Sequence, residues 1–293
     1  MGLSGEGRRR RSAPPSGGAL RPDRDQLTVK TSTTAPKPVS ESAEAHQRFG
    51  QLRRLIGDPQ RRQRLIFGFS LLSFAIVSLL AYLVDQFPVS PFDLTPTRAL
   101  QAISNTIFLQ FMILVSLLGY TPWSVIMVAG GVLLVSVLLD WKDGAYLLLL
   151  TVVQAVANQL IKRAVGRPRP LNTLVDVFMP VAGNSFPSGH VMFYTVFFGF
   201  LLFLALTRLP RSLWRAMAVI LTGGLIVSVG PSRMYLGAHW LSDVIAAYLF
   251  GIIILAFGIE FYLRDFAPRT PTQQEGIVGA HDQAVKNAEE RTP

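Results

Sequence analysis

The sequence lacks cysteine and is short of acidic residues. A disulfide, a thiolate metal site and a cysteine-nucleophile phosphatase mechanism are excluded for this sequence, because each needs a thiol sulfur. The 28 Lys and Arg outnumber the 18 Asp and Glu, giving a formal net charge of +10. The excess lies in the N-terminal region and beside apolar segments, where attraction to anionic lipid accounts for it. No RNA- or DNA-binding pattern accompanies it, so we expect no nucleic-acid partner.

Apolar periodicity is missing at both ends of the sequence. Residues 1–60 are rich in Arg, Ser, Pro and Gly and cannot bury enough surface to offset the entropy of ordering. We therefore predict a disordered, basic cytoplasmic tail over 1–60, a membrane domain over 61–265 and a polar C-terminal tail over 266–293. The pair Asp23 and Asp25 matches the D-x-D pattern of aspartyl phosphatases, but no strand pattern lies beside it.

Long runs without charge dominate the middle of the sequence. Residues 65–84 are twenty residues with no charged side chain. At about 1.5 Å per residue, such a helix spans the hydrocarbon layer of roughly 30 Å. Comparable apolar segments follow, so we predict an all-α, integral membrane bundle of six transmembrane helices. The further predicted crossings are 122–139, 144–161, 190–207, 213–230 and 240–263.

The stretch between the first two crossings is harder to assign. Prolines 88, 91 and 96 interrupt residues 85–96, which we predict to be a loop. Residues 97–118 place polar and apolar side chains on different helical faces, which favours an interfacial or partly re-entrant helix. A further crossing is the alternative, because 107–118 is strongly apolar.

The order of the crossings predicts which loops share a side of the membrane. The ends of the third and fifth crossings lie opposite the N-terminus. By the positive-inside rule the side with most cations is cytoplasmic, so we predict a plasma-membrane protein with both termini inside. These cations are Arg53, Arg54, Arg61, Arg62, Arg64, Arg208, Arg211, Arg215, Arg264 and Arg269. Four others, Lys162, Arg163, Arg167 and Arg169, violate the rule, which indicates a functional demand on the outer side.

Three of the basic residues at segment ends suit a phosphate group. Lys162 offers a point charge, whereas Arg169 and Arg233 offer planar forks that match phosphate oxygens. Prolines on both sides of Arg169 restrict its backbone. For Lys162 alone, snorkelling to the lipid headgroups remains an alternative.

The segment Pro187–His190 leads from a loop into an apolar helix. Its backbone N–H groups are then unpaired and favour an anion. Ser188 adds a hydroxyl, and Gly189 lets the backbone approach a ligand closely. An ordinary helix cap by Ser185 or Ser188 is the alternative, although it does not account for His190.

His239 and Asp243 are four residues apart at the start of the last crossing. This spacing lets the carboxylate orient the imidazole and stabilise its charged form. A polar pair that merely joins two helices is the alternative. His46 and His281 lie in the predicted tails and receive no role.

Together, the three clusters resemble a known signature. The patterns K-x6-R-P (Lys162, Arg169, Pro170), P-S-G-H (187–190) and S-R-x5-H-x3-D (Ser232, Arg233, His239, Asp243) are similar to the three motifs of the type 2 phosphatidic acid phosphatase family. The resemblance covers about residues 65–263. It implies a six-helix membrane enzyme that shares its core with vanadium haloperoxidases and uses neither metal nor cofactor.

The resemblance also implies residue roles. His239 attacks phosphorus to give a phosphohistidine, Asp243 activates His239, and His190 protonates the leaving oxygen. The phosphate-binding positions are Lys162, Arg169, Ser188, Gly189 and Arg233. We expect neutral His239 and protonated His190 in the working state, hence a bell-shaped pH profile.

The implied substrate is a lipid phosphate: phosphatidic acid, phosphatidylglycerol phosphate or a polyprenyl diphosphate. A phosphatase of sugar phosphates or other soluble esters is one alternative. A catalytically silent membrane interaction protein is the other, although the sequence retains the full set of charged residues near the membrane, which is costly to hold without use.

Overall fold

The computed structural model describes residues 58–265. The predicted tails lie outside this range apart from residues 58–60, where Asp58 caps the first described helix by accepting hydrogen bonds from the amides of Gln60 and Arg61. Outside it too are Asp23, Asp25, His46, His281, Arg53, Arg54 and Arg269.

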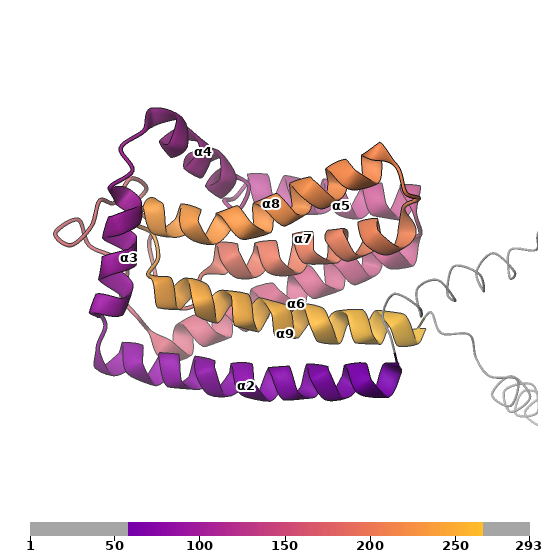
Figure 1. The fold of residues 1–293 in the computed structure, drawn as a ribbon, viewed down its shortest axis with the longest axis horizontal. Coiled ribbons are helices and arrows are strands. Elements are labelled where there is room, and N and C mark those ends of the chain that lie inside the picture. The colour runs from indigo at the N-terminus through magenta and orange to yellow at the C-terminus, as the bar shows by residue number, and fades with distance from the viewer. Residues whose placement is uncertain (1–57, 266–293) are drawn as a thin grey trace, which may run out of the picture.

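Helices make up all the regular structure of the described residues. Their bounds are α2 Pro59–Gln86, α3 Pro91–Gln101, α4 Thr106–Leu117, α5 Trp123–Leu138, α6 Trp141–Val165, α7 Gly189–Arg208, α8 Leu213–Tyr235 and α9 Leu241–Asp265. The longer helices run side by side, and α3 lies across one end of the bundle (Figure 1). The predicted all-α membrane bundle is confirmed.

Within residues 58–265, five helices are long and apolar enough to cross a membrane: α2, α6, α7, α8 and α9. The predicted crossing at 122–139 corresponds to α5, which has only 16 residues. At about 1.5 Å per residue it is roughly 24 Å long, shorter than the roughly 30 Å hydrocarbon layer. The chain is a multi-pass integral membrane protein, and the count of six crossings stays a prediction.

The prediction for residues 85–118 was wrong in two places. A helix, α3, begins inside the predicted loop, because Pro91 occupies the first helical turn, where a missing N–H is harmless, and Ser90 caps it. The single helix expected over 97–118 is divided into α3 and α4 by residues 102–105. Asn105 starts α4 by accepting a hydrogen bond from the amide of Phe108, and a polar cap residue of this kind favours a new helix start.

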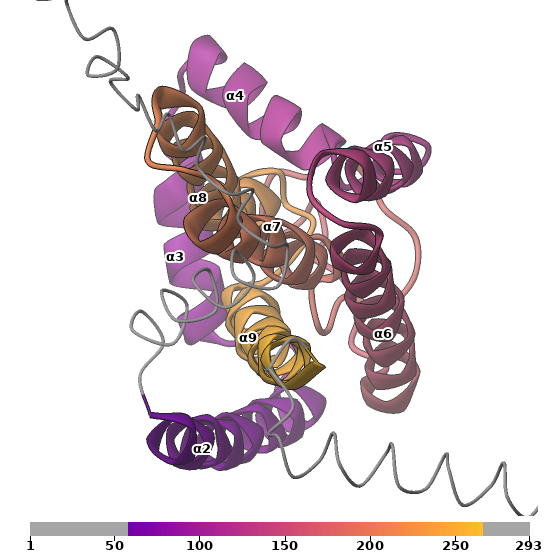
Figure 2. The same cartoon turned by 90° about the vertical axis from the view of Figure 1, so that its right-hand side faces the viewer.

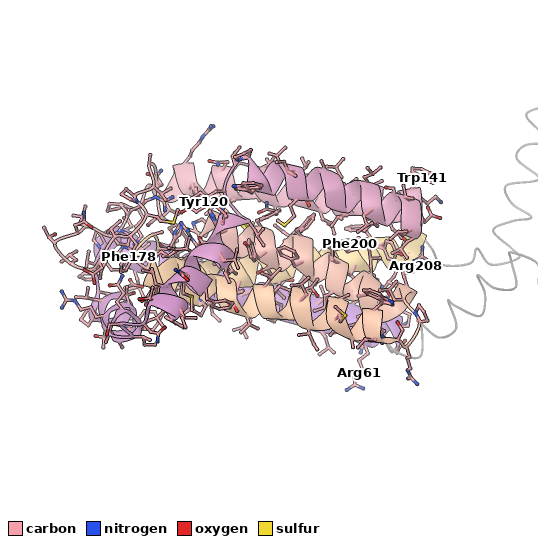
Figure 3. All side chains as sticks on the ribbon, turned by 90° about the horizontal axis from the view of Figure 1, so that it is seen from above. Arg61, Tyr120, Trp141, Phe178, Phe200 and Arg208 are labelled. Atoms are coloured by element: carbon pink, nitrogen blue, oxygen red, sulfur yellow. The ribbon has the colours of Figure 1, made fainter. Side chains whose placement is uncertain are left out.

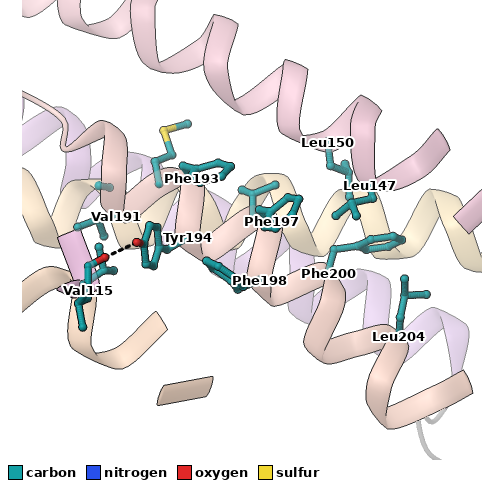
Figure 4. Close-up of a cluster of buried hydrophobic side chains, with 14 of the residues drawn as sticks. Val115, Leu147, Leu150, Val191, Phe193, Tyr194, Phe197, Phe198, Phe200 and Leu204 are labelled. Atoms are coloured by element: carbon teal, nitrogen blue, oxygen red, sulfur yellow. Dashed lines mark hydrogen bonds between the residues drawn. The ribbon is translucent and has the colours of Figure 1, made fainter. Parts of the chain in front are cut away.

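Helix α7 forms the centre of the bundle. Viewed along the bundle, it lies between α6, α8 and α9, whereas α2 packs outside against α9 (Figure 2). Aromatic side chains of α7 fill the core, among them Phe193, Phe197 and Phe200 (Figure 4). The hydroxyl of Tyr194 donates to the carbonyl of Val115, which joins α7 to α4. The first turn of α7 thus belongs to a helix of which most residues are buried.

The two ends of the bundle carry different groups. Tyr120 and Phe178 lie at one end, and Arg61, Trp141 and Arg208 lie at the opposite end (Figure 3). At the latter end, the buried carboxylate of Asp143 accepts from Arg208 at 2.7 Å and from the hydroxyl of Tyr262 at 2.6 Å. These bonds tie α6, α7 and α9 together far from the predicted phosphate site.

Candidate active site

All eight predicted site residues lie at one end of the bundle, on the ends of four helices and the loops between them. Lys162 is in the last turn of α6, Arg233 is in the last turn of α8, and Asp243 is in the first turn of α9. Arg169 and His239 lie in loops. The remaining three, Ser188, Gly189 and His190, are the N-cap and first two residues of α7.

The structure brings His239 between a cation and a carboxylate. Arg169 Nη1 lies 3.2 Å from His239 Nε2, and His239 Nδ1 lies 3.4 Å from Asp243 Oδ2. Because a guanidinium can only donate, Nε2 is the acceptor, and the proton of the neutral ring is on Nδ1, toward Asp243. His239 thus presents the lone pair of Nε2 toward Arg169 and the proton of Nδ1 toward the carboxylate of Asp243. An imidazole oriented in this way can act as a nucleophile through Nε2.

Burial, followed by the positive charges of Arg233, Arg169 and Lys162, holds the pKa of His239 well below its usual value of 6.5. The imidazole is therefore neutral at pH 7. Burial and the charge of Arg233 also lower the pKa of Arg169. The three predicted phosphate-binding cations are close enough to act on one another and on His239, so this end of the bundle has a strong positive field.

Arg233 is fully buried and donates hydrogen bonds to two side chains. Its Nη1 donates to the hydroxyls of Ser116 and, at 2.8 Å, Tyr120. Its guanidinium carbon lies 5.0 Å from the centre of the Tyr120 ring, whose edge-to-face contact with His190 has a centroid distance of 4.5 Å. Tyr120 thereby links the predicted phosphate ligand to the predicted general acid.

Several buried polar atoms at this end have no hydrogen-bond partner among the described residues. They are Ser188 Oγ, His190 Nε2, Arg233 Nε, Arg233 Nη2 and His239 Nδ1. Buried donors are almost always paired, because an unmade hydrogen bond carries the full desolvation penalty. The concentration of such atoms beside the N-terminus of α7 fits an anion with several acceptor oxygens.

The alternative in which Ser188 or Ser185 acts as an ordinary helix cap does not hold. Ser188 is the N-cap residue of α7 but makes no side-chain capping bond. The hydroxyl of Ser185 instead donates to the carbonyl of Pro168 at 3.0 Å. Lys162 is also engaged locally, because its Nζ donates to the carbonyl of Asn184 at 2.8 Å. It is turned toward the loop before α7 and not toward lipid headgroups.

Two residues that sequence reasoning left without a role support Asp243. Arg167 is fully buried, with Nη1 2.6 Å from Asp243 Oδ1 and Nη2 2.6 Å from Asp93 Oδ2. Ser242 joins them, donating from its amide and its hydroxyl to Asp93 Oδ1. The sequence G-R-P-R-P at 166–170 was the available signal for a role of Arg167. Sequence analysis used Arg167 only as one of the four cations that violate the positive-inside rule.

Gly119 lies against the predicted acid. A Cβ atom at this position would be 2.2 Å from Cδ2 of His190, so no side chain fits here without moving the ring. Gly119 precedes Tyr120, and both residues belong to the turn after α4. This turn sets the position of His190 from the side opposite to α7.

Comparison with known proteins agrees with this geometry. Residues 143–266, which contain all eight predicted site residues, match the family model of the PAP2 superfamily. This part of the chain is similar to members of the PAP2 superfamily. The fold agrees with that of a PAP2-type phosphatidylglycerolphosphate phosphatase from Bacillus subtilis, with a TM-score of 0.56, 24% identity, and coverage of 67% of this chain and 96% of that one.

Part of the chain is also similar in sequence to curated proteins. Phosphatidylglycerophosphatase B of Bacillus subtilis is 31% identical over 116 residues, which are 38% of this chain and 54% of that protein. Lipid A 1-phosphatase of Rhizobium johnstonii is 37% identical over 116 residues, 37% of this chain and 43% of that one. The chain therefore spans about half the length of the curated relatives it matches.

Proposed function

We propose that the protein is a membrane phosphatase that hydrolyses a lipid phosphate monoester or diphosphate by way of a phosphohistidine. The observation that supports it most is the group of unpartnered buried atoms around His239 at the N-terminus of α7. Lys162, Arg169, Arg233, Ser188 and the amide of Gly189 bind the phosphoryl oxygens. They neutralise charge that grows during the reaction, and in many enzymes such electrostatic stabilisation contributes most of the rate enhancement.

The first chemical step uses both histidines. The Nε2 lone pair of His239 attacks phosphorus, the bond between phosphorus and the lipid oxygen breaks, and His190 gives its proton to that oxygen. A bound phosphate draws the guanidinium of Arg169 to its own oxygens and so frees Nε2, which now lies 3.2 Å from Nη1. Asp243 faces Nδ1 and stabilises the positive ring that forms.

The second step releases phosphate. Water attacks phosphorus, giving its proton to His190, and the bond to Nε2 breaks, so that His239 is neutral again. Each histidine returns to its starting state, and the balance requires only water and the lipid phosphate. No metal ion takes part in either step, and the two histidines divide attack and proton transfer between them.

The substrate we propose is a lipid phosphate, with phosphatidic acid, phosphatidylglycerol phosphate and polyprenyl diphosphates as candidates. Curated relatives named for lipid phosphatase activities support a lipid. We also propose that the site faces the non-cytoplasmic side of the plasma membrane, with both tails inside. The end of the bundle opposite the site carries Arg61 and Arg208, in agreement with the positive-inside rule.

Phosphate release from purified protein tests this function. Protein in detergent with EDTA is given phosphatidic acid, phosphatidylglycerol phosphate or undecaprenyl diphosphate, beside a soluble sugar phosphate and a His239→Gln variant. Metal-independent release from a lipid, abolished in the variant, is expected. Release from the sugar phosphate alone would support the soluble-ester function. No release from any ester by folded protein would support a silent interaction protein.

A further inference from the structure

Tyr120 brings to the candidate site a hydroxyl that is not among the eight predicted site residues. It lies in the turn between α4 and α5, at the end of the bundle that holds the site (Figure 3). The family model matches residues 143–266 and so does not include Tyr120. What Tyr120 does at the site therefore follows from its contacts in this structure.

The Tyr120 side chain is held in place from the backbone to the ring. Its amide donates to the carbonyl of Leu117 at 3.1 Å, and its carbonyl accepts from the amide of Ser124 at 2.9 Å. The ring packs edge-to-face against His190, and the guanidinium of Arg233 lies over the ring at a distance at which a cation is attracted to it. Tyr120 is thus fixed between the predicted general acid and a predicted phosphate ligand.

The hydroxyl of Tyr120 has an unused proton. Its oxygen accepts a hydrogen bond from Arg233 Nη1 at 2.8 Å. Because a guanidinium can only donate, this contact leaves the O–H proton of Tyr120 free. That proton has no acceptor among the described residues. A phosphoryl group offers acceptor oxygens, so it complements the free donor.

Two predicted phosphate ligands lie beside this hydroxyl. Arg233 Nη1 holds it, whereas Nε and Nη2 of the same planar group are buried and have no partner among the described residues. A phosphate bound by Nη2 lies next to the nitrogen that holds the hydroxyl. Burial and the charge of Arg233 lower the pKa of Arg169, and Asp243 and Tyr120 act on that pKa in the opposite direction, so Tyr120 lies near Arg169 as well.

We propose that Tyr120 is a further phosphate-binding residue of the active site, whose hydroxyl accepts a hydrogen bond from Arg233 and donates one to a phosphoryl oxygen. A donor of this kind stabilises the charge on that oxygen in the transition state. Being neutral, it adds no positive charge to a site where Lys162, Arg169 and Arg233 already repel one another. This inference rests on the proposed function and adds a residue to its phosphate site.

Binding of inorganic phosphate tests the contact independently of turnover. Phosphate that binds the folded protein raises its unfolding midpoint in detergent, and the concentration dependence gives a dissociation constant. Tyr120→Phe keeps the ring and removes only the hydroxyl. It should weaken phosphate binding about 10-fold, the loss expected for one hydrogen bond to a charged group. Tyr82→Phe, at a tyrosine of α2 that is 62% exposed, is the matched control and should bind phosphate as the wild type does.

Turnover distinguishes a direct contact from an effect through Arg233. With a ³²P-labelled lipid phosphate, Tyr120→Phe should lower kcat/KM about 100-fold, the loss typical of one transition-state donor. Added to Arg233→Gln, it should still lower kcat/KM about 10-fold, because a contact with phosphate persists when Arg233 is absent. No further loss in the double variant would show that Tyr120 only positions Arg233, and would overturn the inference.

The outcomes separate this contact from the proposed function. If the wild type hydrolyses a lipid phosphate and Tyr120→Phe is as active as Tyr82→Phe, the proposed function stands and the role of Tyr120 is overturned. Equal phosphate affinity of the two tyrosine variants also overturns it. If Tyr120→Phe alone weakens phosphate binding in a protein that hydrolyses no phosphate ester, the proposed function is removed and the phosphate contact stands.

Discussion

The guanidinium of Arg167 lies 2.6 Å from the carboxylate of Asp243, and both side chains are completely buried. The second terminal nitrogen of the same guanidinium, Nη2, lies 2.6 Å from the carboxylate of Asp93 on α3. The carboxylate that faces His239 is therefore fixed from behind by a residue of the loop after α6 and, through it, by a helix outside the segment that matches the family model. The position of the Asp243 carboxylate and the packing of α3 therefore depend on the same side chain, Arg167.

Substitution of Asp93 should change catalysis from a distance. In Asp93→Asn the pair between Arg167 and Asp243 remains, but Arg167 loses its second ion pair and can shift. We expect kcat to fall by about 10- to 100-fold with KM nearly unchanged, because small displacements near reacting groups have effects of this size. Steady-state phosphate release measures both constants. Asp85→Asn, at an exposed carboxylate on α2, is the matched control.

Removal of Arg167 itself should be more severe. Arg167→Gln leaves two buried carboxylates without their cation, and breaking a buried pair in this way costs about 3–5 kcal/mol. Thermal unfolding in detergent should show a lower midpoint than in Asp93→Asn. An Arg167→Gln protein as stable and active as wild type would show that the buried ion pairs do not hold the site.

The position of Gly119 predicts a selective loss of activity. In Gly119→Ala the new methyl group has to displace the ring of His190, since its Cβ would come 2.2 Å from Cδ2. We expect kcat to fall about 100-fold and the helical fold to persist by circular dichroism. Gly130→Ala is the control, because its Cβ meets open space and alanine is more favourable than glycine in a helix by about 1 kcal/mol. Equal activity of the two variants would exclude a positional role for Gly119.

Two nitrogens of the Arg233 guanidinium are available to bind phosphate, which predicts that lysine at this position gives a less active enzyme than arginine. Arg233→Lys keeps the charge but removes the Nε and Nη2 donors, which have no partner among the described residues. We expect kcat/KM to fall about 100-fold, the loss typical of one transition-state donor, and inhibition by inorganic phosphate to weaken. Arg163→Lys, at an exposed arginine on α6, should retain wild-type values. A fully active Arg233→Lys would remove Arg233 from the phosphate site.

The buried imidazole of His239 predicts the acid limb of the pH profile. Since its pKa lies well below 6.5, His239 stays neutral as the pH falls through 6.5, and kcat/KM should decline only at lower pH. Because His190 has to carry a proton to act as the acid, the proposed mechanism also predicts that kcat, which reports the substrate complex, falls at alkaline pH. A kcat that does not fall by about pH 9 would contradict the assignment of His190 as the acid.

The folding stability of the protein should also depend on the protonation of His239. The unfolded chain protonates His239 near pH 6.5, whereas the folded chain does so only well below that value, because its pKa is lowered. Its contribution to stability is therefore complete above pH 6.5 and is lost as the pH falls below 6.5 toward the folded-state pKa. Unfolding midpoints measured across this range should be less pH-dependent in His239→Gln than in wild type. Equal slopes in the two proteins would contradict the lowered pKa.

Much of the arrangement could be predicted from the sequence, because the informative residues lie at the ends of apolar segments. Charge-free runs locate the long helices, and the spacings around Lys162, Ser188 and His239 identify residues that meet at one end. The start of α3 could not be predicted, because Pro91 reads as a helix breaker until the cap at Ser90 is seen. Nor could the partners of Arg167, which are 74 and 76 residues away in sequence.

Capture of the covalent intermediate would decide whether His239 is the nucleophile. Protein mixed with a ³²P-labelled lipid phosphate is quenched in alkali, which preserves a phosphoramidate, and is then digested and examined for labelled peptides by mass spectrometry. The phosphohistidine mechanism predicts phosphate on His239 in the wild type and none in His239→Gln. Turnover with phosphate on a different residue, or wild-type turnover in His239→Gln, would contradict it.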